Sequence, residues 1–99
     1  MKAYIVGDIT VNDLERYKKY VEKAPHFVAK HEGTYLVRGG DVTVVEGDWS
    51  PTRMVVLEFP SKEHALAFAQ DPEYQEIAVV RQEATASRLI IVEGAPALP

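Results

Sequence analysis

The chain of 99 residues contains no cysteine and no long apolar run, and each absence excludes a class of protein. Without cysteine there is no disulfide, no thiolate nucleophile and no zinc–sulfur site, and a cytoplasmic location is expected. No run approaches the roughly 20 apolar residues of a membrane span, so no membrane partner is expected. The first apolar stretch is too short for a signal peptide. The length indicates a single domain over residues 1–99.

Positive charge is also scarce, because the formal net charge is −4. Nucleic acids favour a basic surface, so none is expected as a partner. His26 and His31 are five apart, which does not place them on one helical face, and His64 is distant in sequence. Metal-binding helices use steps of three or four, so no metal is expected. No serine is marked as a nucleophile, and Gly39-Gly40 lacks the lysine of a phosphate-binding loop.

What is present is a succession of short strands and helices. Apolar patterning predicts strands at residues 3–9, 34–38, 53–59 and 87–93, with a second extended stretch at 42–46 after a glycine turn. A first helix is predicted from residue 13, behind a capping box of Asn12 and Glu15. Its apolar stripe recurs at three- and four-residue steps: Leu14, Tyr17, Val21, Ala24 and Val28. Pro25 is expected to bend this helix, and Gly33 to end it in a left-handed conformation.

A second helix, interrupted once, follows the strand at 53–59. Ser61 is placed to cap it, and Asp71-Pro72 is placed to break it and cap a second half. The order is then strand, helix, strand, strand, helix, strand. Two crossovers of this kind predict an α+β fold of the ferredoxin-like βαββαβ arrangement, with a four-stranded antiparallel sheet and both helices on one face.

Two of the predicted strands are apolar on both faces. In residues 53–59, Val55 and Leu57 alternate with Met54 and Val56, and residues 89–92 are apolar throughout. A sheet with one wet face would alternate apolar with polar residues. Burial is worth roughly 1.5–3 kcal/mol for each such side chain, so a two-fold dimer packed sheet against sheet is predicted. The alternative is a monomer with an exposed apolar patch or a ligand groove.

Two charged residues fall on positions that should be buried. Glu58 alternates with Met54 and Val56, so it is either a general acid or base, a ligand anchor, or the partner of an arginine such as Arg38 or Arg88. Arg81 shares a helix face with Tyr74, Ile77 and Ala78. It either binds an anion or carboxylate in bidentate fashion or ties its helix to a backbone carbonyl or acidic neighbour.

Aromatic side chains supply candidate walls for a pocket. Tyr35, Trp49 and Tyr74 either line a pocket for a small aromatic or apolar ligand or anchor the core and loops. Trp49 falls in a predicted loop, where packing across a dimer and covering a pocket are both open explanations. With Arg38, Glu58 and Arg81 as polar lining, these residues form the predicted ligand site.

Short motifs distributed along the whole chain resemble one family. They are Arg38-Gly39-Gly40, Glu46-Gly47-Asp48-Trp49, Val55-Val56, Glu58-Phe59-Pro60-Ser61, Asp71-Pro72-Glu73-Tyr74-Gln75, Arg81 and the run from Leu89 to Gly94. This set resembles the DUF1330 family of the dimeric α+β barrel group. The resemblance implies two ferredoxin-like sheets facing each other in a homodimer. The larger group includes cofactor-free monooxygenases and haem-degrading enzymes, but the axial histidine of the latter has no clear counterpart here, so no cofactor is expected.

Two functions remain open on the sequence alone. In the first, each subunit of the dimer binds or transforms a small organic molecule in a pocket beside the sheet, with Glu58 as the candidate catalytic base of an oxidation or proton transfer. In the second, the protein is a non-catalytic structural or stress-related dimer, and Glu58 with an arginine forms a polar pair at the interface.

Overall fold

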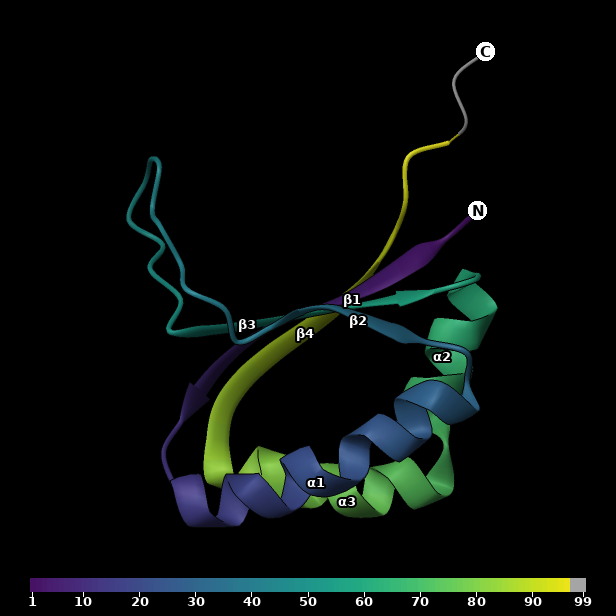
Figure 1. The fold of residues 1–99 in the computed structure, drawn as a ribbon, viewed down its shortest axis with the longest axis horizontal. Coiled ribbons are helices and arrows are strands. Elements are labelled where there is room, and N and C mark those ends of the chain that lie inside the picture. Colours follow the sequence, from purple (N-terminus) through teal and green to yellow (C-terminus); the bar gives the residue numbers. More distant parts are fainter. Residues whose placement is uncertain (97–99) are drawn as a thin grey trace.

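The computed structural model of the chain describes residues 1–96. In chain order the elements are β1 (Ala3–Val11), α1 (Leu14–Lys30), β2 (Thr34–Arg38), β3 (Arg53–Phe59), α2 (Lys62–Gln70), α3 (Pro72–Ala84) and β4 (Thr85–Glu93). The strands form one antiparallel sheet in the order β2-β3-β1-β4. All helices lie on one side of this sheet, and β1 and β4 curve toward them at one end (Figure 1). The predicted ferredoxin-like arrangement is confirmed.

Capping side chains set the starts of the helices, two of them as expected. The predicted capping box of Asn12 and Glu15 is wrong, because the N-cap of α1 is Asp13, whose Oδ1 accepts from the Arg16 N–H at 3.1 Å, and α1 begins one residue later than predicted. Ser61 Oγ accepts from the His64 N–H at 3.1 Å and starts α2. Asp71 Oδ1 accepts from the Glu73 N–H at 2.9 Å, with proline at the first position of α3. The predicted interruption at residues 71–72 is therefore correct, and it separates two distinct helices.

The end of α1 differs from the prediction. Glu32 adopts the left-handed conformation, with φ of 63°, and Gly33 does not. Gly33 is instead required by packing, because a Cβ there would lie 2.6 Å from the Phe59 ring and 2.9 Å from Val28. The glycine therefore lets the chain pass close to the core as it leaves the helix. Its role is to make space, and not to adopt the left-handed conformation of a C-cap. Within α1, Pro25 is accommodated in one continuous helix.

The predicted extended stretch at 42–46 is not a strand. The last ladder pair of β2 and β3 joins Arg38 to Val55, and Gly39, with φ of 73°, turns the chain after one more hydrogen bond to Met54. Residues 41–52 then form a long loop that projects beyond the sheet (Figure 1). Apolar residues in extended sequence need a partner strand to form a ladder, and here none adjoins them. At the other end of the chain, β4 begins at Thr85, two residues earlier than predicted.

The two faces of the sheet differ in their cover. The inner face, toward the helices, carries buried Ile5, Ile9, Leu57 and Phe59. Leu14 was predicted to join this core but is exposed, because it lies at the first turn of α1. The outer face is formed by residues that alternate with these: Tyr4, Val6, Asp8, Val37, Met54, Val56, Glu58, Arg88, Ile90 and Val92. No element covers it in the chain as described, and Ile90 is 61% exposed.

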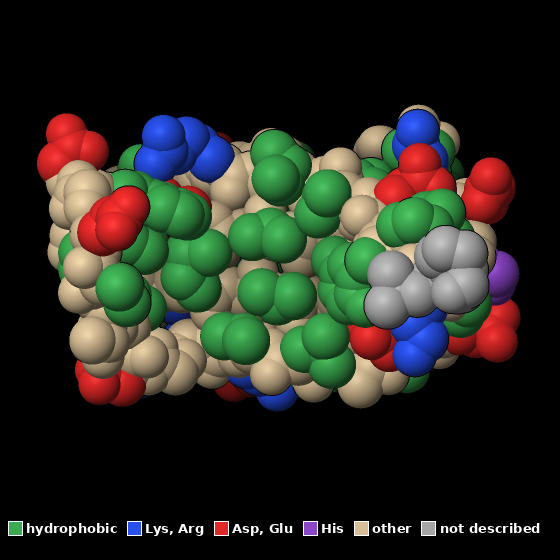
Figure 2. Space-filling model, turned by 90° about the horizontal axis from the view of Figure 1, so that it is seen from above, with side chains coloured by type: hydrophobic (Ala, Val, Ile, Leu, Met, Phe, Trp, Pro, Cys, Tyr) green, Lys and Arg blue, Asp and Glu red, His purple; other side chains and the backbone are tan. Residues whose placement is uncertain are grey.

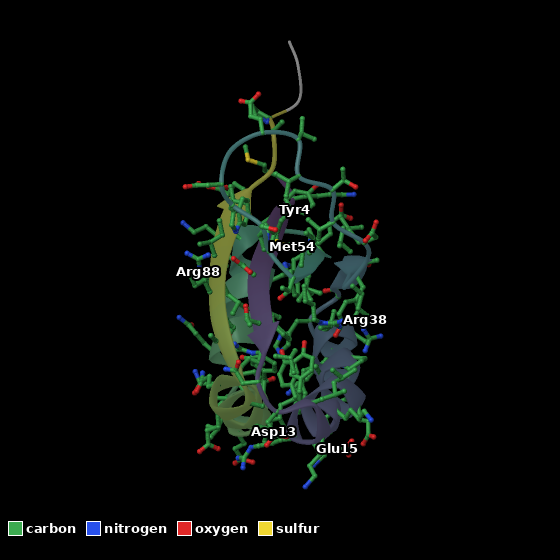
Figure 3. The ribbon with its side chains drawn as sticks, turned by 90° about the vertical axis from the view of Figure 1, so that its left-hand side faces the viewer. Tyr4, Asp13, Glu15, Arg38, Met54 and Arg88 are labelled. Carbon is green, nitrogen blue, oxygen red and sulfur yellow. The ribbon has the colours of Figure 1, made fainter. Side chains whose placement is uncertain are left out.

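Figure 2 shows this outer face, with hydrophobic side chains across its middle and charged side chains toward its margins. In Figure 3, Arg88 and Arg38 lie at opposite edges of the sheet, which agrees with the edge positions of β4 and β2. Of the helices among residues 1–96, none has the length and apolarity needed to cross a membrane.

Candidate functional site

A cavity lies between the inner face of the sheet and the helices. Its volume is about 40 Å³, which is room for about three waters. Every strand and every helix contributes to its lining. The aromatic and charged residues of the lining are Tyr17, Tyr20, Tyr35, Arg38, Arg53, Phe68, Tyr74 and Arg81. Its remaining walls are aliphatic or glycine, from Ile5 and Gly7 on β1 to Leu89 on β4.

A bulge in β2 brings two of these residues to the same face. Tyr35 and Arg38 are three apart, so in a regular strand they would point to opposite sides of the sheet. The register shifts between Tyr35 and Val37, so Tyr35 pairs with Leu57 while Arg38 pairs with Val55. Since Leu57 and Val55 both belong to the inner face, Tyr35 and Arg38 both line the cavity. Arg53, two residues before Val55 on β3, reaches the cavity by ordinary alternation.

Four tyrosines surround the cavity, and they are linked to one another. The Tyr20 and Tyr74 hydroxyls are hydrogen-bonded at 2.7 Å, across α1 and α3. Tyr17 and Tyr20 stack with ring centroids 5.9 Å apart. Burial raises the pKa of Tyr20 far above its ordinary value, with a smaller contribution from Tyr74. Burial also raises the pKa of Tyr35. The hydroxyl groups of Tyr20 and Tyr35 therefore act as neutral hydrogen-bonding groups at physiological pH.

Each arginine of the cavity lies over one of these tyrosines. The guanidinium carbons lie 4.5 Å from the Tyr35 ring for Arg38, 5.5 Å from Tyr17 for Arg53 and 5.5 Å from Tyr20 for Arg81. Arg53 Nε also donates to the Tyr17 hydroxyl at 3.1 Å, and Arg38 Nη2 donates to the Val21 carbonyl at 3.3 Å. Cation–π contacts hold the positive groups in place without neutralising them.

No carboxylate of residues 1–96 lines this cavity. Within the part of the chain that the structure describes, none of the three arginines forms an ion pair. The chain as a whole carries a net charge of −4, so acidic side chains are abundant elsewhere. The cavity therefore concentrates positive charge inside an acidic protein, next to apolar walls.

Arg81 is the most buried of the three, at 6% exposure. Its Nη1 donates to Ser87 Oγ at 2.7 Å, while its buried Nε–H has no acceptor among the described residues. The sequence left two alternatives for Arg81, an anion site or a tie to a carbonyl or acidic group. Its Nη1 contacts neither a backbone carbonyl nor an acidic side chain, but the neutral hydroxyl of a serine near the start of β4.

The structure brings together four of the six predicted site residues. Arg38, Tyr35, Tyr74 and Arg81 all line the cavity. Glu58 does not, because it belongs to the outer face, opposite Tyr4 on β1. Its partner is also different from the expected arginines, since Lys2 Nζ lies 3.2 Å from Glu58 Oε1. A ligand-binding or catalytic role for Glu58 stays a prediction, at a place separate from this cavity.

Trp49 also lies apart from the cavity. Its Nε1 donates to Asp8 Oδ2 at 3.0 Å, and Arg88 Nη2 donates to the same oxygen at 2.7 Å. The Trp49 hydrogen bond, followed by that of Arg88, lowers the pKa of the Asp8 carboxyl. Trp49 is 56% exposed and, with Val6 and Ile90, borders a hollow on the outer face. Of its two open explanations, this position favours packing against a partner over covering the cavity.

Three arginine and tyrosine residues of the cavity were missed by the sequence reasoning. Arg53 shares the alternation of Val55 and Leu57, so it belonged to the inner face. Tyr20 follows Tyr17 by three residues and therefore lies beside it on α1. Tyr17 itself was placed in the core stripe but not in the site.

Outside the cavity, a serine, a histidine and a carboxylate are linked by hydrogen bonds. Ser61 Oγ is 2.6 Å from His64 Nδ1, and His64 Nε2 is 3.1 Å from Glu32 Oε2. Ser61 Oγ also accepts the backbone N–H of His64 as the cap of α2. The contact thus belongs to a local helix start. Within residues 1–96, no three His, Asp or Glu residues are grouped to hold a metal ion.

Comparison with known proteins identifies a family and a fold. The model of a domain of unknown function, DUF1330, matches residues 2–95. A protein of unknown function from Rhodopseudomonas palustris superposes with a TM-score of 0.78 at 19% identity, over 97% of this chain and 84% of that chain. A cofactor-independent oxygenase from Streptomyces nogalater gives 0.68 at 13% identity, over 99% and 97%. A dimeric ferredoxin-like protein of unknown function from Jannaschia sp. gives 0.68 at 13% identity, over 95% and 100%. No curated protein matches in sequence.

Proposed function

The chain belongs to the DUF1330 family, and from that membership we propose that it is a homodimer in which each subunit binds a small organic molecule in the cavity between sheet and helices. The observation that carries this proposal is the lining of the cavity. Aliphatic walls, four tyrosines and three arginines converge on one enclosed space in a domain that could have filled it with side chains. Ligand sites combine an apolar body with a few fixed polar groups in this way.

The cavity alone is too small for a ring, so a ring-sized ligand would also occupy the space next to it. A neighbouring groove of about 600 Å³ between α3 and β4 shares Ile5, Phe68, Tyr74, Arg81 and Leu89 with the cavity. A ligand can therefore reach the cavity past Arg81 and extend into the groove. The oxygenase from Streptomyces nogalater has the same fold, and at 13% identity its reaction is not transferred to this chain.

The outer face supports the dimer. It is apolar at its centre, and the Jannaschia protein of the same fold is dimeric. Packing two copies through this face would bury Ile90 and Val92, which are largely exposed in one chain. It would also give Trp49 a partner surface. A second candidate function, a structural or stress-related dimer without a ligand, is favoured by the Lys2–Glu58 pair at this face, in which the Glu58 carboxylate is partly buried.

A matched pair of cavity variants tests ligand binding. Native mass spectrometry of freshly purified protein should show a dimer with a discrete additional mass, or thermal denaturation should reveal stabilisation by members of a library of single-ring compounds. Ala24→Leu fills the cavity from α1 and should abolish either signal. Ala29→Leu is the control, because it makes the same change on the exposed side of the same helix. Unchanged binding in Ala24→Leu, or no ligand in either assay, favours the structural dimer.

A further inference from the structure

We infer that the ligand of this cavity is an organic carboxylate whose charged group binds Arg81. This inference rests on the proposed function, because it names the chemical class of the molecule that the cavity would hold. It is carried by one buried hydrogen-bond donor, by the charge of the lining and by the shape of the space beside Arg81.

The first observation is that Arg81 is buried but incompletely satisfied. Its side chain is held from one side, where Nη1 donates to Ser87 Oγ at 2.7 Å. Thr85 is part of the same junction, because its hydroxyl donates to the Arg81 carbonyl at 2.7 Å. The buried Nε–H is left without an acceptor among residues 1–96. A buried donor without a partner costs about 1–3 kcal/mol, and more when the group is charged. An acceptor supplied by a ligand would remove this cost.

The second observation is the charge around Arg81. Arg38 and Arg53 line the same cavity, and no acidic side chain of the described chain lines it with them. Buried charges in proteins are normally paired, since an unpaired charge in a poorly solvated space is costly, and this applies to Arg81, which is buried. Arg53 is half-buried and Arg38 is exposed, so they add positive potential at the cavity, and together the three cations favour an anion over a neutral or cationic guest. Tyr20 and Tyr74 are hydrogen-bonded to each other, so one of the two hydroxyls keeps a proton that it can donate to the same anion.

The third observation is geometric. A guanidinium presents Nε and Nη donors side by side, and this fork matches the two oxygens of a carboxylate. The rest of the lining is aliphatic and aromatic, so the body of the ligand should be apolar. Arg81 lies where the cavity meets the groove between α3 and β4. The charged group would then bind at the junction, with the ring extending along the groove.

Matched pairs of probes test the inference. Benzoate and 2-naphthoate are compared with benzamide and 2-naphthamide, which keep nearly the same shape but carry no charge. Affinities are measured by calorimetry with the full-length protein. We expect at least one carboxylate to bind about tenfold or more tightly than its amide, the difference that a charge-assisted, bidentate hydrogen bond supplies.

Variants assign the preference to one residue. Arg81→Met keeps the length of the side chain and should reduce carboxylate affinity to that of the amide, without reducing the affinity for the amide. Arg81→Lys keeps the charge but loses the fork, so it should retain only part of the preference. Arg88→Met removes an arginine of the outer face and should leave the preference unchanged. Circular dichroism establishes that each variant is folded, and the Arg81 Nε–H resonance in the wild-type protein should shift on addition of the carboxylate.

The outcomes separate this inference from the proposed function. Equal affinity for a carboxylate and its amide overturns the inference while leaving ligand binding in place. The same holds if only neutral compounds bind, or if the preference persists in Arg81→Met. If no carboxylate binds and the single-ring library is also negative, both the inference and the proposed function are overturned.

Discussion

The two faces of the sheet, formed by alternating residues of the same strands, differ in what covers them and in where their polar side chains lie. The inner face is covered by helices, yet it encloses a space with three arginines and four tyrosines. The outer face is not covered by any helix or strand among residues 1–96, yet its centre is apolar, with Val6, Val56 and Ile90 on neighbouring strands. The inner face thus encloses polar groups among its core side chains, and the outer face exposes apolar side chains between its charged margins. Both features are expected if the inner face meets a ligand and the outer face meets another subunit.

The largest effect should come from breaking the inner face. Phe59 is fully buried against Phe68, with ring centroids 5.4 Å apart. Phe59→Ala should lower the free energy of unfolding by about 3–5 kcal/mol, because it removes core contacts and leaves a cavity. Urea denaturation measures the loss. The loss should be equal at low and high protein concentration, since the residue lies within one subunit. Met54→Ala, on the outer face of the same strand, should instead give a loss that depends on concentration.

The next effect should come from breaking the outer face. Val56→Glu places a charge at the middle of the proposed interface, and burying an unpaired charge costs about 3–5 kcal/mol. We therefore expect the dimer to dissociate at least about a hundredfold more readily in analytical ultracentrifugation. The inner cavity should still bind its ligand. Leu14→Glu adds the same charge at the exposed start of α1 and serves as the control. A wild-type protein that stays monomeric at micromolar concentration would contradict the dimer.

A smaller effect, limited to acid, concerns the end of the inner layer. Lys30 and His31 each hydrogen-bond Asp71 Oδ2 at 2.8 Å, and with the helix N–H groups they hold the pKa of Asp71 well below its ordinary 3.8. Below about pH 4, Asp71 becomes protonated in the unfolded chain but stays ionised in the folded chain, so the free energy of unfolding falls as the pH falls. Asp71→Asn, which cannot titrate, should show a shallower loss between about pH 6 and pH 3. Asp41→Asn, in the exposed loop, should leave the loss unchanged.

The smallest effect is expected for the charged pair of the outer face. Glu58→Gln breaks the contact with Lys2, whose side chain is mostly exposed. Such pairs contribute about 1 kcal/mol or less, so stability should change little. Ligand affinity at the cavity should not change, because Glu58 lies on the other face of the sheet. A large loss of ligand binding in this variant would show that the two faces are not independent. Calorimetry with the ligand found for the wild-type protein measures this.

Most of the fold could be predicted because local signals and burial agreed. Ser61 and Asp71-Pro72 placed the helix starts correctly, since a capping side chain and a proline act on the backbone beside them. The errors arose where tertiary contacts decided. A glycine at position 33 is typical of a helix C-cap, but the reason for a glycine here is the ring of Phe59, which is distant in sequence and leaves no space for a Cβ. Residues 42–46 had the composition of a strand, but no strand adjoins them.

The candidate site could be predicted in part for the same reason. Tyr74 and Arg81 share one helix face, so their common position follows from helical periodicity. Tyr35 and Arg38 could not be placed together by strand alternation, because their common face depends on a bulge set by pairing with β3. The prediction that Glu58 shares a face of β3 with Met54 and Val56 was correct. Its ionic partner, however, is Lys2 and not one of the predicted arginines.

The junction of α3 and β4 has a mechanical consequence. No loop separates Ala84, the last residue of α3, from Thr85, the first of β4. The carbonyl of Ala84 also accepts the backbone N–H groups of Asn12 and Asp13 at 2.8 and 3.0 Å, which ties the start of α1 to the same point. Helices and sheet are therefore fastened together at this corner of the molecule. Arg81 lies one helical turn before Ala84, so a guest bound by Arg81 would be anchored where the two layers are already joined.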